Sequence, residues 1–281
     1  MSDIYLKRKI EKKKKKWKED LERKPLIIKG PRQVGKTESI RRFAEANYQS
    51  FIYINFVEEP KYKYITEDGY SADDIIKNIS RIDPSKVFDA GKTILFFDEI
   101  QDFPQIATAL KFFKIDGRFD VICSGSLLGI NYKQIESNSV GYKTDYTMSS
   151  LDFEEFLWAK GYHDDTVADM LCHMETQKAF NQLEMNLYSN LFLDYCILGG
   201  MPAVVKQYIV KGTFEGTLEI QRQLIADYKE DIRKYAEGVD QTRILNIFEQ
   251  IPNQLAKENK KCQISKVARG ARFKDYRGCF E

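Results

Sequence analysis

The residues most suited to chemistry form one short segment near the N-terminus: Gly30, Pro31, Arg32, Gln33, Val34, Gly35, Lys36 and Thr37. They match the pattern G-x-x-x-x-G-K-[ST], in which glycines let several backbone N–H groups approach phosphate oxygens. A helix that begins near the lysine points the positive end of its dipole at the same anion. We therefore predict that these residues bind a nucleotide, with Lys36 on its β- and γ-phosphates and Thr37 supplying a hydroxyl ligand to Mg²⁺.

Two carboxylates provide the second part of this chemistry. Asp98 and Glu99 follow the apolar run Ile94-Leu95-Phe96-Phe97, which is typical of a buried strand. At the end of such a strand Asp98 is suited to hold the magnesium, often through water, and Glu99 to polarise an attacking water. An apolar run that ends in Asp-Glu can also be a simple loop cap without a metal. A glycine-containing turn can match the first motif by chance. The two motifs together, separated by one predicted strand over 51–56, favour a nucleotide site over either coincidence.

A small polar turn is the third candidate element of this site. Ser124, Gly125 and Ser126 follow a predicted strand over 119–123. In a parallel sheet the carboxyl ends of the strands lie along one crevice, which would place this turn beside the γ-phosphate. We predict that Ser124, with Ser126 as the second choice, hydrogen-bonds the phosphate or the lytic water. Serines also form ordinary turns, and that interpretation is equally open.

Alternating strands and helices must position these three segments. Apolar and β-branched runs predict strands over 26–29, 51–56, 93–97 and 119–123, with a fifth near 145–148, and helical periodicity predicts helices over 36–46, 72–82 and 104–115. Such alternation implies a parallel sheet with right-handed crossovers. The predicted fold class is therefore α/β, with a parallel sheet flanked by helices.

After Leu151 the strand pattern stops and helical periodicity takes over. Asp152 is the predicted N-cap of a first helix that bears Phe153 and Phe156. Further helices are predicted over 176–195, 214–235 and 241–257. The Gly-Gly-Met-Pro sequence at 199–202 breaks this pattern, and its simplest interpretation is a tight connection between helices. The second half of the chain is thus predicted to be all helical.

Charge is distributed unevenly along the chain. The 281 residues carry a formal net charge of only +2, but residues 1–24 hold 11 basic and 5 acidic side chains, a balance of +6, and residues 255–281 hold 8 and 3, a balance of +5. The stretch between them holds 25 basic and 34 acidic residues, a balance of −9. Residues 1–24 are predicted to form a charged helix whose apolar positions Ile10, Trp17 and Leu21 make one thin stripe.

Five segments together resemble one known family: GPRQVGKT, ILFFDEIQ, CSGSLLG, SLDFEEFLWA and LGGMPAVV. They are similar to segments of prokaryotic AAA-type P-loop ATPases, in which an ATPase core precedes a poorly characterised helical domain with winged-helix character. The similarity extends from Lys24 to Glu281. It implies a P-loop NTPase sheet of the AAA, ASCE-like type that binds and hydrolyses ATP with Mg²⁺. It further implies a Walker B pair in Asp98 and Glu99 and a sensor role for Ser124.

The resemblance also divides the chain into four segments. They are a basic N-terminal helix (1–24), the P-loop ATPase core (25–150), a helical lid or second domain (151–238) and an incomplete winged-helix-like segment (239–281). Where family members often carry a Gly-Arg pair, this chain has Gly141-Tyr142-Lys143. Lys143 is displaced by one residue and lacks the planar fork of arginine, so we assign it no role. Relatives continue beyond the point where this chain stops, and we therefore expect a C-terminal truncation.

The leading functional hypothesis is a magnesium-dependent ATPase that couples ATP binding and hydrolysis to conformational change and to a partner. A nucleotide-switched binding protein with little or no turnover is the alternative, which the absent arginine favours. A small-molecule kinase on the same core lacks an evident acceptor site and a basic lid. A GTPase is disfavoured because the nearest string to Asn-Lys-x-Asp, at 259–262, lies in the wrong region and lacks the aspartate.

Partners other than ATP are less well specified. The basic segments at both ends could contact DNA phosphates, although lysine-rich helix faces are usually just solvated, and a protein partner or homo-oligomer is also open. Five scattered cysteines without a Cys-x-x-Cys pair fit a reducing compartment, and two histidines offer little for a zinc site. No apolar run approaches the ~18 residues of a membrane span. We therefore expect a cytoplasmic protein without a membrane segment.

Overall fold

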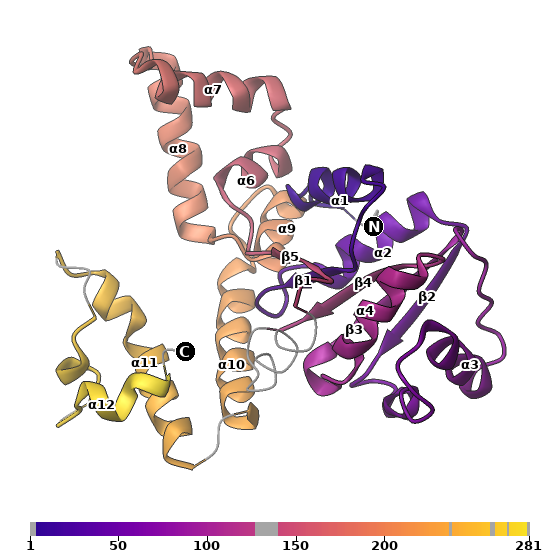
Figure 1. Cartoon of the computed structure of the whole chain (residues 1–281). Coiled ribbons are helices and arrows are strands. Elements are labelled where there is room, and N and C mark those ends of the chain that lie inside the picture. Colours follow the sequence, from indigo (N-terminus) through magenta and orange to yellow (C-terminus); the bar gives the residue numbers. More distant parts are fainter. Residues whose placement is uncertain (1–3, 127–139, 236–237, 259–261, 269, 280–281) are drawn as a thin grey trace. The chain divides into compact units, whose positions relative to one another are not determined.

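A computed structural model of the chain describes residues 4–126, 140–235, 238–258, 262–268 and 270–279 (Figure 1). Its contacts divide the chain into two compact units, Met1–Thr217 and Leu218–Glu281. The boundaries predicted after residues 24, 150 and 238 do not coincide with this division. The N-terminal helix, the sheet and the first helices after the sheet all fall within the first unit.

A five-stranded parallel sheet organises the first unit. Its strands are β1 (Leu26–Lys29), β2 (Ser50–Asn55), β3 (Thr93–Asp98), β4 (Asp120–Gly125) and β5 (Thr144–Thr147), in the spatial order β2-β3-β4-β1-β5. The predicted fold class is confirmed, and each predicted strand lies within one or two residues of its observed position. β4 pairs with both β1 and β3. The strand that ends at the Ser124 turn therefore lies between the strands that carry the two other motifs.

Different helices cover the two faces of the sheet. α1 (Ile10–Glu19) and α2 (Lys36–Asn47) share one apolar cluster with the sheet, and α3 (Ala72–Ile82) and α4 (Ile106–Asp116) share the other. Two 3-10 turns, η1 (Pro60–Tyr64) and η2 (Ile100–Asp102), follow β2 and β3. In β3, Ile94 and Phe96 join the first cluster, whereas Leu95 and Phe97 join the second. Because alternate residues of a strand point to opposite faces, burial of both faces requires this continuous apolar run.

The predicted N-terminal helix over 1–24 is wrong in extent. Of the described residues 4–24, only Ile10–Glu19 is helical, and residues 4–8 form an irregular segment before it. Ile10, Lys14 and Trp17 are spaced by four and three residues, so they share one helix face, and all three are buried. Leu21 lies beyond the end of the helix and is 91% exposed. The lysine-rich segment is therefore one of the helices that cover the sheet, and its apolar stripe ends at Trp17.

Helices make up the rest of the first unit. They are α6 (Phe153–Ala159), α7 (Asp164–Thr176), α8 (Gln182–Leu198) and α9 (Pro202–Lys211). The predicted N-cap at Asp152 is confirmed, because its side chain accepts the N–H of Glu155 and Glu155 completes a capping box. The single helix predicted over 176–195 is wrong at its start. A second capping box, between Asn181 and Glu184, begins α8 there and separates it from α7.

The break between α8 and α9 has a steric cause. The N–H of Leu151 donates to the carbonyl oxygen of Gly200 at 2.7 Å. A Cβ at Gly200 would lie 2.0 Å from the carbonyl oxygen of Leu151. The helical connection therefore passes directly against the segment that leaves the sheet, and only glycine permits this approach.

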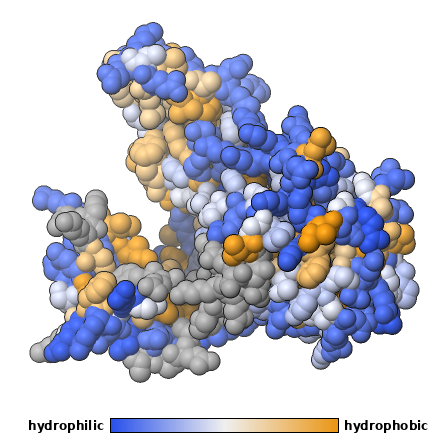
Figure 2. Space-filling view, in the orientation of Figure 1, coloured by the Kyte–Doolittle hydropathy of each residue, from blue (hydrophilic) through white to orange (hydrophobic). Residues whose placement is uncertain are grey.

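The helices α7 and α8 are packed on one side only. Val167 and Met170 of α7 and Leu191 of α8 form a small cluster with Leu157 of α6. Other apolar side chains of α8 are exposed: Leu183, Met185, Leu187, Phe192, Leu193 and Ile197. Figure 2 shows orange areas at the upper left, where Figure 1 places α7 and α8.

The described elements of the second unit are all helices or 3-10 turns. Its elements are most of α10 (Thr217–Tyr235), α11 (Gly238–Leu255), η3 (Ile264–Lys266), α12 (Phe273–Tyr276) and η4 (Arg277–Cys279). The all-helical expectation is confirmed, whereas the winged-helix start predicted within 239–281 stays a prediction. Among the described residues, no helix combines the length and the apolar character needed to cross a membrane.

Candidate active site

The loop between β1 and α2 passes close to the chain after β5. A Cβ at Gly30 would lie 2.0 Å from the carbonyl oxygen of Met148, so the backbone has no room for a side chain there. Gly35 has φ 91° and Gln33 has φ 62°, both in the left-handed region. These conformations turn the chain tightly around the loop before α2 begins at Lys36. The six predicted loop residues from Gly30 to Gly35 thus form one compact turn at the carboxyl end of β1.

The side chain of Lys36 is held over this loop. Its Nζ donates to the carbonyl oxygens of Gly30 at 2.9 Å and Pro31 at 2.7 Å, and the residue is only 6% exposed. Burial lowers the pKa of Lys36, and the nearby charges of Glu99 and Asp98 oppose this change. The positive charge of Arg32 adds to the lowering. The predicted lysine, both predicted carboxylates and an arginine of the loop are therefore electrostatic neighbours.

Asp98 collects hydroxyl groups from three elements. The hydroxyl of Thr37 donates to Asp98 Oδ2 at 2.9 Å, and that of Tyr53 donates to the same oxygen at 3.2 Å. The Ser124 hydroxyl donates to Oδ1. Asp98 is 2% exposed and Ser124 is fully buried. The structure therefore brings together the predicted residues Thr37, Asp98 and Ser124, which lie far apart in the sequence.

Tyr53 was not among the predicted site residues. In the sequence it looks like one more aromatic residue of a strand, and its ring does pack against that of Phe96, with 5.2 Å between centroids and the rings tilted by 41°. The register of β2 on β3 pairs Asn55 with Asp98, and Tyr53 reaches the carboxylate from two residues earlier. Burial raises the pKa of its hydroxyl to about 12. Tyr53 therefore stays a proton donor to Asp98 at neutral pH.

Glu99 is held in an unusual conformation beside Asp98. Its φ is 54°, in the left-handed region, and its own N–H donates to Asp98 Oδ1 at 2.9 Å. The amide of Gln101 donates to Glu99 Oε2. Burial raises the pKa of Glu99, while this hydrogen bond and the charges of Arg32 and Lys36 lower it. A non-glycine residue in such a conformation persists only where its surroundings hold it, which is common at functional sites.

Gln101 links Glu99 to the turn after β4. Its Oε1 accepts the N–H of Ser126 at 3.2 Å, and the residue is 3% exposed. A Cβ at Gly125 would lie 2.8 Å from the same Oε1, so the glycine makes room for this contact. The sequence reading missed Gln101, although it lies only two residues after Glu99. Among the described residues, the buried hydroxyl of Ser126 has no hydrogen-bond partner, so Ser124 is the serine that meets the carboxylates.

A cavity of about 180 Å³ lies beside the loop. Its lining comes from the N-terminal segment, the loop with α2, and α9: Ile4, Tyr5, Leu6, Arg8, Val34, Gly35, Glu38, Arg42, Pro202, Ala203 and Lys206. The lining is thus mostly apolar side chains with charged groups among them. Such a composition is typical of pockets for small organic ligands.

Lys143, to which no role is assigned, lies in an ion pair. Its Nζ contacts both carboxylate oxygens of Asp145, at 2.9 Å and 2.7 Å, and its side chain is 10% exposed. The last residues of the segment CSGSLLG, at 127–129, lie outside the described residues. The described part of that segment ends at Ser126.

Two family models match different parts of the chain. Residues 22–157 match the family model of an AAA domain, and residues 189–281 match a domain of unknown function. No curated protein matches the chain closely enough to count as a relative.

The fold similarity to solved structures rests on the first of the following three, which alone among them has a TM-score above 0.5. A Walker-type ATPase of Pyrococcus abyssi, PABY2304, is 18% identical, and the match covers 90% of this chain and 80% of that chain with a TM-score of 0.53. PCH-2 of C. elegans is 10% identical over 56% of this chain and 41% of its own, with a TM-score of 0.31. A RuvB variant of Thermotoga maritima is 19% identical over 54% and 50%, with a TM-score of 0.34. At these identities the likeness concerns the fold alone.

Proposed function

We propose that the P-loop AAA-type ATPase domain formed by residues 22–157 binds ATP with Mg²⁺ and hydrolyses it. The helical region that follows would transmit the state of the nucleotide to a partner. The proposal assigns phosphate binding to the loop from Gly30 to Gly35 and to Lys36, metal binding to Thr37 and Asp98, and catalysis to Glu99, Lys36 and Ser124.

The contact between Thr37 and Asp98 is the observation that carries this proposal. Their oxygens lie 2.9 Å apart, although one residue begins α2 and the other ends β3. A hydroxyl and a carboxylate oxygen at one point form a donor set that suits Mg²⁺. Mg²⁺, when bound, supplies the charge that neutralises the β- and γ-phosphate oxygens. Ser124 and Tyr53 hold the Asp98 carboxylate in place by their hydrogen bonds.

Lys36 and the loop supply the phosphate contacts. The ammonium group of Lys36 donates to two carbonyl oxygens of the loop, at Gly30 and Pro31. Phosphate oxygens carry more negative charge than carbonyl oxygens and would compete for the same protons. Nucleotide binding would therefore exchange these contacts without exposing the buried ammonium group to water.

Glu99 is placed to act on a water molecule as general base. One of its carboxylate oxygens accepts from Gln101, which fixes the orientation of the group. Burial raises its pKa, and a base with a raised pKa binds a proton more readily near neutral pH. Since the base must be ionised to accept a proton, hydrolysis would decline on the acid side at a higher pH than for an ordinary glutamate.

The cavity beside the loop offers a place for the adenine base. It borders Val34 and Gly35, and it lies on the side of the loop that faces the N-terminal segment and α9. A planar apolar ring fits a lining of aliphatic and aromatic side chains better than a phosphate does. We therefore assign this cavity to the nucleoside part of the ligand.

Binding of ATP by purified variants tests the proposal. We expect Lys36→Ala to weaken ATP·Mg²⁺ binding by about 100-fold, because it removes a charge-assisted contact to phosphate. Thr37→Val should bind ATP with little dependence on Mg²⁺. Lys92→Ala removes an exposed lysine and is the matched control. If Lys36→Ala binds ATP as tightly as the wild type, the proposed site is wrong.

A nucleotide-switched binding protein is the second candidate. The observation that favours it is the hydrogen bond from Gln101, which engages one oxygen of Glu99 and could keep the base from the water. The two candidates differ in single-turnover phosphate release. A switch would bind ATP tightly but release phosphate at the background rate, and Gln101→Ala would then raise that rate.

A further inference from the structure

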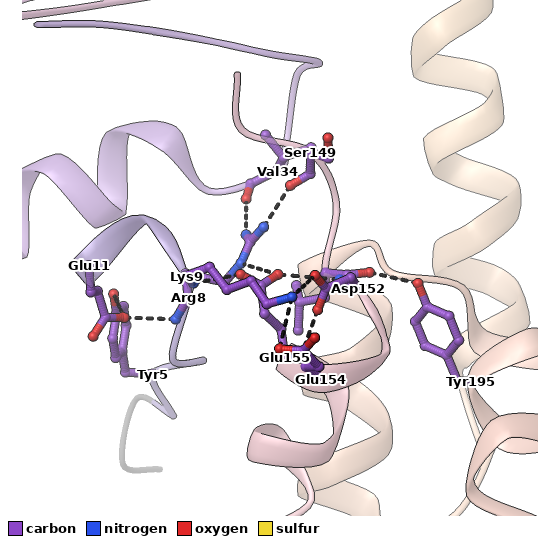
Figure 3. Close-up of polar contacts among 11 residues, drawn as sticks. Tyr5, Arg8, Lys9, Glu11, Val34, Ser149, Asp152, Glu154, Glu155 and Tyr195 are labelled. Carbon is purple, nitrogen blue, oxygen red and sulfur yellow. Dashed lines mark hydrogen bonds and ion pairs between the residues drawn. The ribbon is translucent and has the colours of Figure 1, made fainter. Parts of the chain in front are cut away.

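Arg8 connects the N-terminal segment to the phosphate-binding loop (Figure 3). Its guanidinium group donates to the carbonyl oxygen of Val34 at 2.7 Å and to that of Ser149 at 2.6 Å. A third bond, from Nε to Glu155 Oε2, is 3.0 Å long. Arg8 is 5% exposed; its bonds to Val34 and Glu155 are buried, and its bond to Ser149 is partly buried. One side chain therefore joins the loop, the segment after β5 and helix α6.

The contact with Val34 has a consequence for the next backbone N–H. In a trans peptide the carbonyl and the N–H point in opposite directions. A Val34 carbonyl held by Arg8 therefore turns the N–H of Gly35 away from Arg8. Gly35 has φ 91° and carries no Cβ, so little in the chain itself fixes the orientation of this peptide. Arg8 supplies the missing constraint within the segment G-x-x-x-x-G, whose N–H groups are the phosphate donors.

Glu155 extends this contact into the helical region. One of its oxygens accepts from the N–H of Lys9 at 2.6 Å, and the other accepts from Arg8 and from the N–H of Asp152 at 3.3 Å. The same glutamate is the third residue of α6 and closes its capping box. The first turn of α6 is therefore bonded through Arg8 to the Val34 carbonyl.

We propose that Arg8 is a positioning residue for phosphate binding, which orients the Val34–Gly35 peptide and couples it through Glu155 to the start of α6. The inference rests on the proposed function of the loop. It differs from the assignment of the loop itself, because Arg8 lies 26 residues before Val34 and touches it only through a backbone oxygen. The planar fork of arginine makes three divergent bonds here, which a lysine does not reproduce.

Arg8→Lys tests the positioning role with two ligands, ATP·Mg²⁺ and inorganic tripolyphosphate. We expect both dissociation constants to rise by the same factor of roughly ten, the effect of one charge-assisted hydrogen bond. Lys7→Ala, which removes a neighbouring exposed charge paired with Asp164, should leave both unchanged. Equal affinities in Arg8→Lys and wild type would overturn the proposal. A loss for ATP without a loss for tripolyphosphate would also overturn it, because Arg8 would then act on the nucleoside cavity.

Hydrogen exchange of the wild-type protein and of Glu155→Gln provides a second test. Binding of ATP·Mg²⁺ should slow amide exchange in peptides that cover Phe153–Ala159, and Glu155→Gln should lose this slowing while it still binds ATP. An α6 that exchanges at the same rate with and without bound ATP would contradict the coupling. A wild-type protein that binds neither ATP nor tripolyphosphate would contradict the proposed function itself, which separates that failure from a failure of the Arg8 assignment.

Discussion

The two basic ends of the chain use their charges in different ways. In the N-terminal segment Arg8 and Lys14 are buried, at 5% and 1% exposure, and both donate to groups of the sheet unit. At the C-terminal end the described cations Lys266, Arg272, Lys274 and Arg277 are exposed, and Lys257 is half-buried and donates to Gln254 Oε1 at 2.9 Å. The two segments have nearly the same net charge in the sequence, +6 and +5. The N-terminal segment nevertheless buries two of its eleven cations, whereas none of the described C-terminal cations is buried.

A run of positive charges in the sequence therefore does not show which of its side chains are buried. α1 contributes Ile10 and Trp17 to the apolar cluster, and helical spacing then brings Lys14 to the same buried face. The short turns near the C-terminus bury Val267 and Tyr276 and leave the cations outside. Substitutions at matched positions in the two ends should therefore differ in size.

The largest difference is expected for arginine. Arg8→Ala should lower the free energy of unfolding by about 3–5 kcal/mol, because it leaves the Glu155 carboxylate buried without its cation. Arg272→Ala, at an exposed position, should change it by less than about 0.5 kcal/mol. Urea denaturation of the two variants measures both values. Equal effects would show that the Arg8 network contributes nothing specific to stability.

The next largest difference in stability is expected between substitutions of one aromatic residue in each end of the chain. Trp17→Ala should cost about 3 kcal/mol, since its ring packs 6.2 Å from that of Phe43 and its indole N–H donates to the Lys24 carbonyl at 2.7 Å. Phe273→Ala, which removes a ring that is 64% exposed, should be nearly neutral. Thermal denaturation checks both. A stable Trp17→Ala protein would mean that α1 is not part of the core.

The buried residue Lys14 should lower the free energy of unfolding, and this loss should depend on pH. Burial lowers the pKa of Lys14 to about 8, from 10.5 in the unfolded chain. The unfolded chain therefore binds this proton more tightly, so the charge reduces stability below pH 8, and the penalty disappears as the pH rises from about 8 towards 10.5. Lys14→Met should add about 1–3 kcal/mol at pH 7 and remove this part of the pH dependence. Lys274→Met serves as the exposed control, and an unchanged pH profile in Lys14→Met would contradict the prediction.

The smallest expected effect is on DNA binding by the exposed C-terminal cations. We expect the exposed C-terminal cations to give weak DNA binding that falls steeply with salt. The double variant Arg272→Ala/Lys274→Ala should reduce the slope of log K against log salt by about 2 and leave ATP hydrolysis unchanged. Fluorescence anisotropy with duplex DNA at several salt concentrations measures this slope. A wild-type protein that does not bind DNA even at low salt would remove DNA from the proposed partners.

The parallel sheet and the central contacts of the site follow from local patterns. Asp98 and Ser124 lie at the ends of apolar strands, and Lys36 and Thr37 begin the helix after the loop that follows β1. Parallel strands bring such ends to one edge of the sheet. The capping signal at Asp152 was also readable, because Glu155 is the third residue after the cap. The spacing of nearby residues was therefore sufficient to predict the position of a residue wherever a single helix or strand determines that position.

Long-range contacts were not readable in the same way. Arg8 meets Val34 and Glu155 across 26 and 147 residues, and nothing in its neighbourhood distinguishes it from the lysines around it. Tyr53 looks like a core residue of β2 until the register places it near Asp98. The contacts of both residues depend on how separate helices and strands pack against one another. That packing cannot be predicted from the spacing of residues in a single sequence.

Phosphate release by the wild type and by Glu99→Gln, measured side by side at saturating ATP and Mg²⁺, tests the central claim most directly. The substitution keeps the size of the side chain and removes its capacity to accept a proton. We expect Glu99→Gln to retain ATP binding and to lose phosphate release by about 100-fold or more, within the range of a general base. Equal rates of phosphate release above background in the two proteins would contradict the assignment of Glu99, and background rates in both would contradict the ATPase itself.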